Sequence, residues 1–166
     1  MVLTKDELIS SLQNEVRILL HLAGKVEPGM IDYRPTEKQR STLELLQYLT
    51  IMGPGLVQAT KSGTFDGEAW SAAEKAALGR TFDETVAAIG ALSAMYADEL
   101  GTMSDADFRT EIEMFGMKHT KGSFLVNMVL SGHAAYRTQL FCYLKACGRQ
   151  ELNTMNLWAG MDQPAG

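Results

Sequence analysis

The residues of this chain that could do chemistry are concentrated in the stretch 131–148, which reads SGHAAYRTQLFCYLKACG. At about 100° per residue, a helix over this stretch places Gly132, Tyr136 and Gln139 on one inward face. Histidines at positions i and i+4 share a helical face and can hold one metal ion. On this face the i and i+4 residues are Gly132 and Tyr136. Glycine has no ligand atom, and the phenol of a tyrosine stays neutral because its ordinary pKa is about 10. The face is therefore predicted to be a structural polar core or the wall of a small-ligand pocket.

Long amphipathic helices must position this face. Capping boxes, in which a hydroxyl and a carboxylate satisfy each other's backbone amides, begin at Thr4, Ser41 and Thr81 and open three helices. A fourth helix is expected over 120–147, ended by Gly148 in the left-handed conformation. The order of these elements predicts an all-α, four-helix bundle with a crossover.

Other segments connect or interrupt the long helices. The run Gly53-Pro54-Gly55 is expected to kink or break the second helix, because proline lacks an amide hydrogen and crowds the preceding turn. An Ala-rich helix is expected over 66–78, a long connection over 27–40 and an extended segment over 108–117. The tail, 153–166, is expected to be a packed strap or a frayed end. No linker divides the chain, so one domain is expected over 1–166.

The last helix resembles that of the DinB-like family of four-helix bundles. In that family two histidines four residues apart precede an arginine and a glutamine, and the helix closes with a basic residue and a glycine. Arg137, Gln139, Lys145 and Gly148 stand at the latter four positions. The resemblance extends over most of the chain, including an Arg-Pro loop within 33–35, and it implies a DinB-like bundle that forms a homodimer.

The resemblance also implies where a metal would lie. Relatives with a complete site use three histidines, one from the second helix and two from the last, to hold a divalent metal that activates a water or a thiol. The corresponding residues here are Tyr48, Gly132 and Tyr136. Helical phase supports Tyr48, which falls within about 50° of the apolar stripe of its helix. Gln47 points nearly opposite and would occupy the position only if the register were shifted by one residue.

No cofactor is expected at such a site. The gap at Gly132 could be filled by the ring of Tyr136 or Tyr48, or it could remain as a small pocket with Gln139 at its wall. In either case, Tyr48 and Tyr136 are expected to approach each other inside the bundle. The predicted function is that of a small-ligand-binding or interaction protein. The alternative is a metal-dependent thiol transferase or hydrolase of the DinB-like type with an altered ligand set.

The three histidines of the chain offer only a rearranged metal site. His21 lies nearly opposite the apolar stripe of the first helix and is expected at the surface. His133 is about 90° from the inward face of the last helix, and His119 lies at the start of that helix. A zinc or nickel site built from His119 and His133 is the alternative. Arg137 faces away from the predicted pocket and is expected to form a salt bridge with another helix or another subunit.

Composition restricts the remaining classes of function. A net charge of -5 over 166 residues opposes binding to nucleic acid, which needs a basic face. The apolar runs are too short to span a membrane. Acidic residues stand near the N-terminus, where a signal peptide would be basic, so the protein is expected in the cytoplasm. Cys142 and Cys147 would lie roughly 8 to 9 Å apart on one helix, too far for a disulfide.

Overall fold

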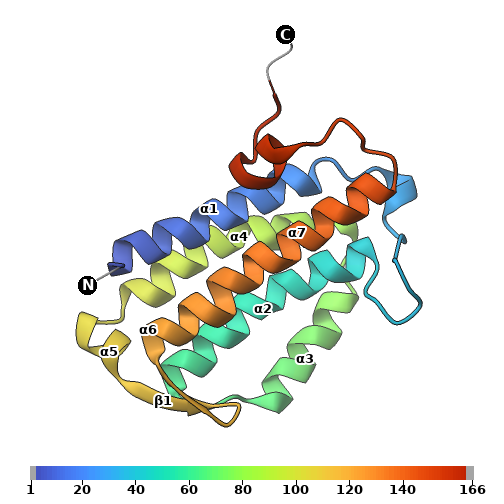
Figure 1. Cartoon of the computed structure of the whole chain (residues 1–166). Coiled ribbons are helices and arrows are strands. Elements are labelled where there is room, and N and C mark those ends of the chain that lie inside the picture. Colours follow the sequence, from blue (N-terminus) through green and yellow to red (C-terminus); the bar gives the residue numbers. More distant parts are fainter. Residues whose placement is uncertain (1–2, 164–166) are drawn as a thin grey trace.

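The computed structural model describes residues 3–163, and its four long helices form a bundle (Figure 1). These helices are α1 (Lys5–Ala23), α2 (Thr42–Ser62), α4 (Phe82–Gly101) and a composite helix made of α6 (Lys121–Phe124), η2 (Leu125–Leu130) and α7 (Ser131–Ala146). The composite helix runs parallel to α1, while α2 and α4 run the opposite way. The predicted all-α bundle is confirmed. Among residues 3–163, no helix combines the length and apolar character needed to cross a membrane.

The predicted capping boxes start the helices. In each of α1, α2 and α4, the hydroxyl of the N-cap residue accepts from a backbone amide three residues on, and the glutamate there accepts from the N-cap amide. The apolar stripes then meet in one core; α1, for example, contributes Leu8, Leu12, Val16 and Leu19, all at most 3% exposed. Local caps thus place the helix starts, and burial of the stripes holds the helices together.

Two connections link the long helices: a loop over one end of the bundle and an additional helix on its outside. Both α1 and α2 pack against α4 and α7, so the segment 24–41, with the short 3₁₀ turn η1 (Pro28–Met30), passes over one end of the bundle. The predicted Ala-rich helix is α3 (Gly67–Leu78), which lies along the outside of α2 and returns the chain to the start of α4 (Figure 1). This outer helix brings Trp70 and Glu74 beside α2, where they contribute to the site described below.

The helix α2 is continuous through its Gly-Pro-Gly run, so the predicted break does not occur. The two glycines instead allow close packing. A Cβ atom at Gly53 would lie 1.8 Å from the hydroxyl oxygen of Tyr96, and one at Gly55 would lie 2.8 Å from the Trp70 ring. The run therefore allows one aromatic side chain from α3 and one from α4 to pack against the backbone of α2.

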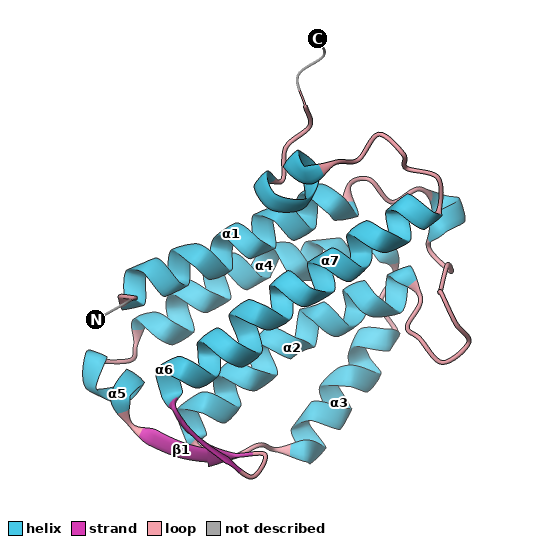
Figure 2. Cartoon of the chain, in the orientation of Figure 1, coloured by secondary structure: helices cyan, strands magenta, loops and turns pink. Residues whose placement is uncertain are grey.

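A β-hairpin closes the end of the bundle opposite the 24–41 connection (Figure 2). It pairs β1 (Glu111–Met114) with β2 (Met117–Thr120) in antiparallel register, after the one-turn helix α5 (Asp105–Arg109). The extended segment predicted over 108–117 is therefore shifted toward the C-terminus. A short alternation cannot define a hairpin whose turn, Phe115-Gly116, takes positive φ at both residues.

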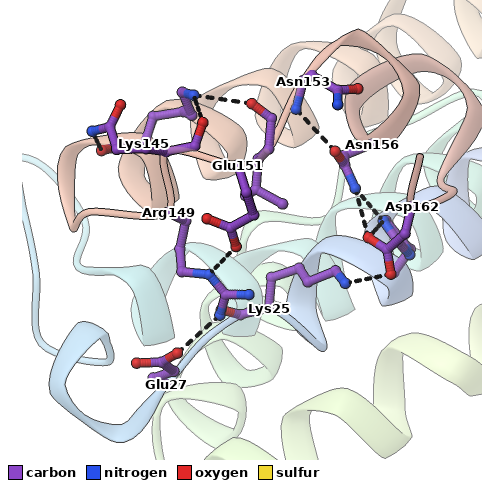
Figure 3. Close-up of polar contacts among 11 residues, drawn as sticks. Lys25, Glu27, Lys145, Arg149, Glu151, Asn153, Asn156 and Asp162 are labelled. Carbon is purple, nitrogen blue, oxygen red and sulfur yellow. Dashed lines mark hydrogen bonds and ion pairs between the residues drawn. The ribbon is translucent and has the colours of Figure 1, made fainter. Parts of the chain in front are cut away.

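The tail is a packed strap across α1, with one turn of π-helix, η3 (Met155–Ala159), over the residues that are described. Lys25 pairs with Asp162 at 2.7 Å, and Arg149 contacts both Glu27 and Glu151 (Figure 3). His21, predicted at the surface, is partly covered: its side chain is 17% exposed, and the Asn156 amide of the strap donates to its ring at 3.1 Å. Residues 164–166 of the predicted tail lie outside the described residues.

Candidate functional site

The phenol rings of Tyr48 and Tyr136 meet between α2 and α7. Their centroids are 5.1 Å apart with the rings at 67°, an edge-to-face contact. The predicted approach of these two side chains is confirmed. Burial, followed by the neighbouring Tyr136 hydroxyl, raises the pKa of Tyr48 to about 12. Tyr48 is therefore a neutral phenol at physiological pH and lacks the charge that would make it a strong ligand of a divalent metal.

The space beside Gly132 is filled by a side chain of α2. A Cβ atom at Gly132 would lie 2.9 Å from the sulfur of Met52 and 3.2 Å from its methyl carbon. Met52 follows Tyr48 by one helical turn and is 2% exposed. The gap expected at Gly132 is therefore occupied neither by a tyrosine ring nor by an open pocket. A thioether adapts well to such an irregular space because it is unbranched and polarizable.

The two glutamines named as candidates lie away from this contact. The amide of Gln47 donates to the Arg80 carbonyl at 2.8 Å, at the junction between α3 and α4. The amide of Gln139 donates to the Tyr143 hydroxyl at 2.5 Å, and that hydroxyl donates to the Arg40 carbonyl at 3.0 Å. Tyr48 is thus the residue of α2 that faces Tyr136, and Gln139 helps to fasten α7 to the 24–41 connection.

His133 is buried, at 1% exposure, and its Nε2 shares a 2.6 Å hydrogen bond with the Tyr96 hydroxyl. The boundary position expected from helical phase is wrong. The cause is that α7 is covered on two sides: the face with Tyr136 meets Tyr48 of α2, and the adjacent face with His133 meets Tyr96 of α4. Within the described residues, Nδ1 of His133 has no hydrogen-bond partner. This buried His–Tyr pair joins α7 to α4 and was not predicted.

The remaining candidate ligand, His119, lies on β2 with its ring 5.5 Å from that of Phe124. The Nε2 of His133 is already engaged by Tyr96. Across residues 3–163, no three His, Cys, Asp or Glu side chains come together in a group that could hold a metal ion. The donor geometry of this part of the chain therefore gives the pairing of His119 with His133 no support.

Arg137 lies one turn beyond His133 and also faces the core, at 4% exposure. Its Nε is 2.9 Å from Oε2 of Glu15 on α1, so the arginine forms the predicted salt bridge to another helix. The guanidinium also donates to the Leu157 carbonyl of the strap. Burial raises the pKa of Glu15 despite the opposing effect of Arg137. The pair thus fixes α7, α1 and the strap to one another at a considerable desolvation cost.

The buried imidazole predicts a pH dependence of stability. Desolvation lowers the pKa of His133 from 6.5 to about 4, so the unfolded chain takes up a proton at a higher pH than the folded chain does. Above pH 6.5 the imidazole is neutral in both states and the free energy of unfolding is unaffected. As the pH falls from 6.5 toward 4, protonation of the unfolded chain lowers the free energy of unfolding by roughly 3 kcal/mol. Urea unfolding at several pH values measures it. His133→Gln, which can still accept from Tyr96, should flatten this part of the profile; an unchanged slope would contradict the assignment.

A cavity of about 490 Å³ lies at the end of the bundle that the hairpin closes. It is bordered by the start of α1, by α5 and by the start of the composite helix. Several of its polar groups are already engaged. Thr4 and Thr120 cap helices, and the Lys5 ammonium donates to the carbonyls of Gly101 and Met103. The cavity is remote from the Tyr48–Tyr136 contact. It has the size of a ligand site, but the polar groups just named are used by the fold itself.

Comparison with known proteins identifies the architecture. The chain is similar to the crystal structure of a DinB-like protein, YjoA from Bacillus subtilis, with a TM-score of 0.68 and 18% sequence identity. The match covers 88% of this chain and 94% of that one. No protein-family model and no curated protein matched the sequence. The bundle, with its outer helix and composite last helix, therefore has the DinB-like fold.

Proposed function

We propose that this DinB-like bundle works without the divalent metal that the resemblance implies for its relatives, and that it binds a small organic ligand beside Tyr48. One observation carries the proposal: Tyr48 and Tyr136 are in contact, and the sulfur of Met52 occupies the space beside Gly132. The three positions where the resemblance places histidines thus hold two phenols and a glycine, and packed atoms fill the region between them.

Donor chemistry supports this proposal. A divalent metal in a DinB-like site needs three imidazole ligands and an open coordination position. Tyr48 offers a phenol whose pKa burial raises to about 12, so binding as a phenolate would require removal of a tightly held proton. A thioether, such as that of Met52, is a ligand for soft metals rather than for the borderline ions that imidazoles hold.

The face of Tyr48 turned toward α3 supports a ligand-binding role. A crevice of about 10 Å³ lies there, bordered by Tyr48, Ile51 and Ala77 and by the polar side chains of Arg40 and Glu74. The crevice combines apolar side chains with a few polar groups, as small-molecule sites do, but at about 10 Å³ it holds a ligand only if the Arg40 side chain moves away. The proposal includes a homodimer in the cytoplasm, as the family resemblance and the composition suggest. Sedimentation at several protein concentrations tests the dimer.

The direct test is the metal content of protein purified without an affinity tag. Elemental analysis is expected to find no stoichiometric zinc, nickel or iron, because the ligand positions lack imidazoles. A metal-dependent transferase or hydrolase with an altered ligand set makes the opposite prediction. Near-equimolar metal that is lost in His119→Ala or His133→Ala would establish that alternative and reject the proposal.

A further inference from the structure

A guanidinium group covers one face of Tyr48. The Cζ atom of Arg40 is 3.9 Å from the centroid of the Tyr48 ring, within the range of a cation–π contact. Trp70 of α3 and Tyr136 of α7 lie against the same ring, with centroids at 6.1 and 5.1 Å. Trp70 reaches this position because Gly55 has no side chain. Tyr48 is therefore enclosed by two aromatic rings and one organic cation, which its own chain supplies.

A carboxylate, that of Glu74, lies beside the Arg40 guanidinium and can neutralise a positive charge there. Oε1 of Glu74 is 3.9 Å from Nη2 of Arg40. The other carboxylate at the crevice, Glu44, is engaged by Arg34 at 3.2 Å and by the Ser41 amide at 2.7 Å. Glu74 is consequently the carboxylate left to neutralise whatever cation lies over Tyr48.

Arg40 is held weakly enough to be displaced. The side chains of Arg40 and Glu74 are 41% and 42% exposed, and an ion pair that is so well solvated contributes little. The backbone of Arg40, in contrast, is fixed, because its carbonyl accepts from the buried Tyr143 hydroxyl at 3.0 Å. The guanidinium can therefore rotate into solvent while the chain stays in place.

Movement of the Arg40 guanidinium into solvent would enlarge the crevice beside Tyr48. The crevice that remains beside Arg40, about 10 Å³, is the size of roughly one water molecule. The departing planar group adds its own volume and exposes the face of Tyr48, with Glu74 at one side. Such a space accepts a flat or compact cation that is weakly hydrated. A small metal ion would keep its water shell and gain little from the ring.

We propose that the face of Tyr48 beside α3 is a binding site for a small organic cation with a guanidinium-type head group, and that Arg40 is an intramolecular occupant which the ligand displaces. The inference rests on the proposed function and names the chemical class of its ligand. Arg40 then sets the affinity: the site is available only in the fraction of molecules in which this side chain has moved away.

The test uses methylguanidinium chloride as the probe and Arg40→Ala as the opened site. Binding is followed by the fluorescence of Trp70, with Trp158→Phe in all proteins so that Trp70 is the single tryptophan. Arg40→Ala should show saturable binding at least about tenfold tighter than the protein that retains Arg40. Sodium chloride at the same ionic strength should give no saturable change.

Matched variants in the Arg40→Ala protein identify the site. Tyr48→Phe should bind within about twofold, because the ring and not the hydroxyl attracts the cation. Tyr48→Leu should abolish binding. Glu74→Gln should weaken it, whereas Glu68→Gln, six residues earlier on α3, should not. The Glu74 and Glu68 variants decide the matter if circular dichroism shows that Tyr48→Leu has unfolded.

Three results would each overturn the cation site. One is that Arg40→Ala binds methylguanidinium no more tightly than the protein with Arg40. The second is that binding is unchanged in Tyr48→Leu, and the third is that it falls equally in Glu74→Gln and Glu68→Gln. Metal analysis remains a separate readout: a protein without metal that fails to bind the probe rejects the cation site and leaves metal independence standing.

Discussion

Replacing Glu15 with alanine is expected to cost about 3 to 5 kcal/mol of the free energy of unfolding, because the change leaves the buried Arg137 guanidinium without its counter-charge. The side chains of the two residues are 13% and 5% exposed, so water cannot take the place of the carboxylate. Urea unfolding at neutral pH measures the loss. A buried pair is more sensitive to removal of one partner than to removal of both, so Glu15→Ala/Arg137→Met should be more stable than Glu15→Ala alone.

Glu151→Ala provides the matched control. Glu151 also pairs with an arginine, at 2.7 Å from Arg149, but its side chain is 60% exposed (Figure 3). An exposed pair is worth at most about 1 kcal/mol. If Glu15→Ala were no more destabilising than Glu151→Ala, the ion pair would not be the buried fastener between α1, α7 and the strap.

Gly53→Ala is expected to destabilise the protein by roughly 3 to 5 kcal/mol, although alanine is the better helix former. The added Cβ would lie 1.8 Å from the Tyr96 hydroxyl oxygen, so the phenol must move and its buried hydrogen bond to His133 is lost. Thermal or urea unfolding gives the magnitude. The double variant Gly53→Ala/Tyr96→Phe should recover part of the loss, since the clashing oxygen is gone.

Gly90→Ala is the control for this substitution. Gly90 also lies inside a long helix, α4, but a Cβ there would meet no described atom within 4 Å apart from the helix's own nearby backbone. The change is expected to stabilise the protein by up to about 1 kcal/mol through helix propensity. Opposite signs for the two variants would show that close packing, and not backbone entropy, determines the glycine at position 53. Equal effects would contradict this explanation.

Helix positions were predictable because their signals are local. The Thr4, Ser41 and Thr81 caps each act within one turn, and the apolar stripes repeat at the helical period, so both survive in any tertiary context. The hairpin and the one-turn helix before it were located poorly, since such short elements depend on packing against the bundle. The predicted break at the Gly-Pro-Gly run does not occur, and the close packing of Tyr96 and Trp70 against its two glycines cannot be read from the run itself, because it depends on side chains of two other helices.

The candidate site was predictable in outline and not in detail. The contact of Tyr48 with Tyr136 follows from phase, because each position lies within a regular stretch of helix. His133 was misplaced because the prediction allowed α7 one buried face, whereas α4 covers a second face of this helix through Tyr96. The filling of the space at Gly132 by Met52 depends on the distance between α2 and α7, which helical periodicity alone does not contain.

The central proposal is that Tyr48, Gly132 and Tyr136 stand where the resemblance places the ligands of a metal and that they do not bind one. Restoring the ligands tests it most directly. The variant carries histidine at positions 48, 132 and 136, with Met52→Ala added because the Met52 sulfur would otherwise lie 2.9 Å from a Cβ at position 132. Equilibrium dialysis with zinc or nickel is expected to give about one bound equivalent for this variant and none for the natural sequence.

The register control carries histidine at position 47 in place of position 48. Gln47 contacts the α3–α4 junction, so this second variant is expected to bind no stoichiometric metal. One equivalent in the first variant and none in the second would establish that Tyr48, Gly132 and Tyr136 occupy the site. Absence of metal from the first variant, or equal binding by both, would contradict the claim.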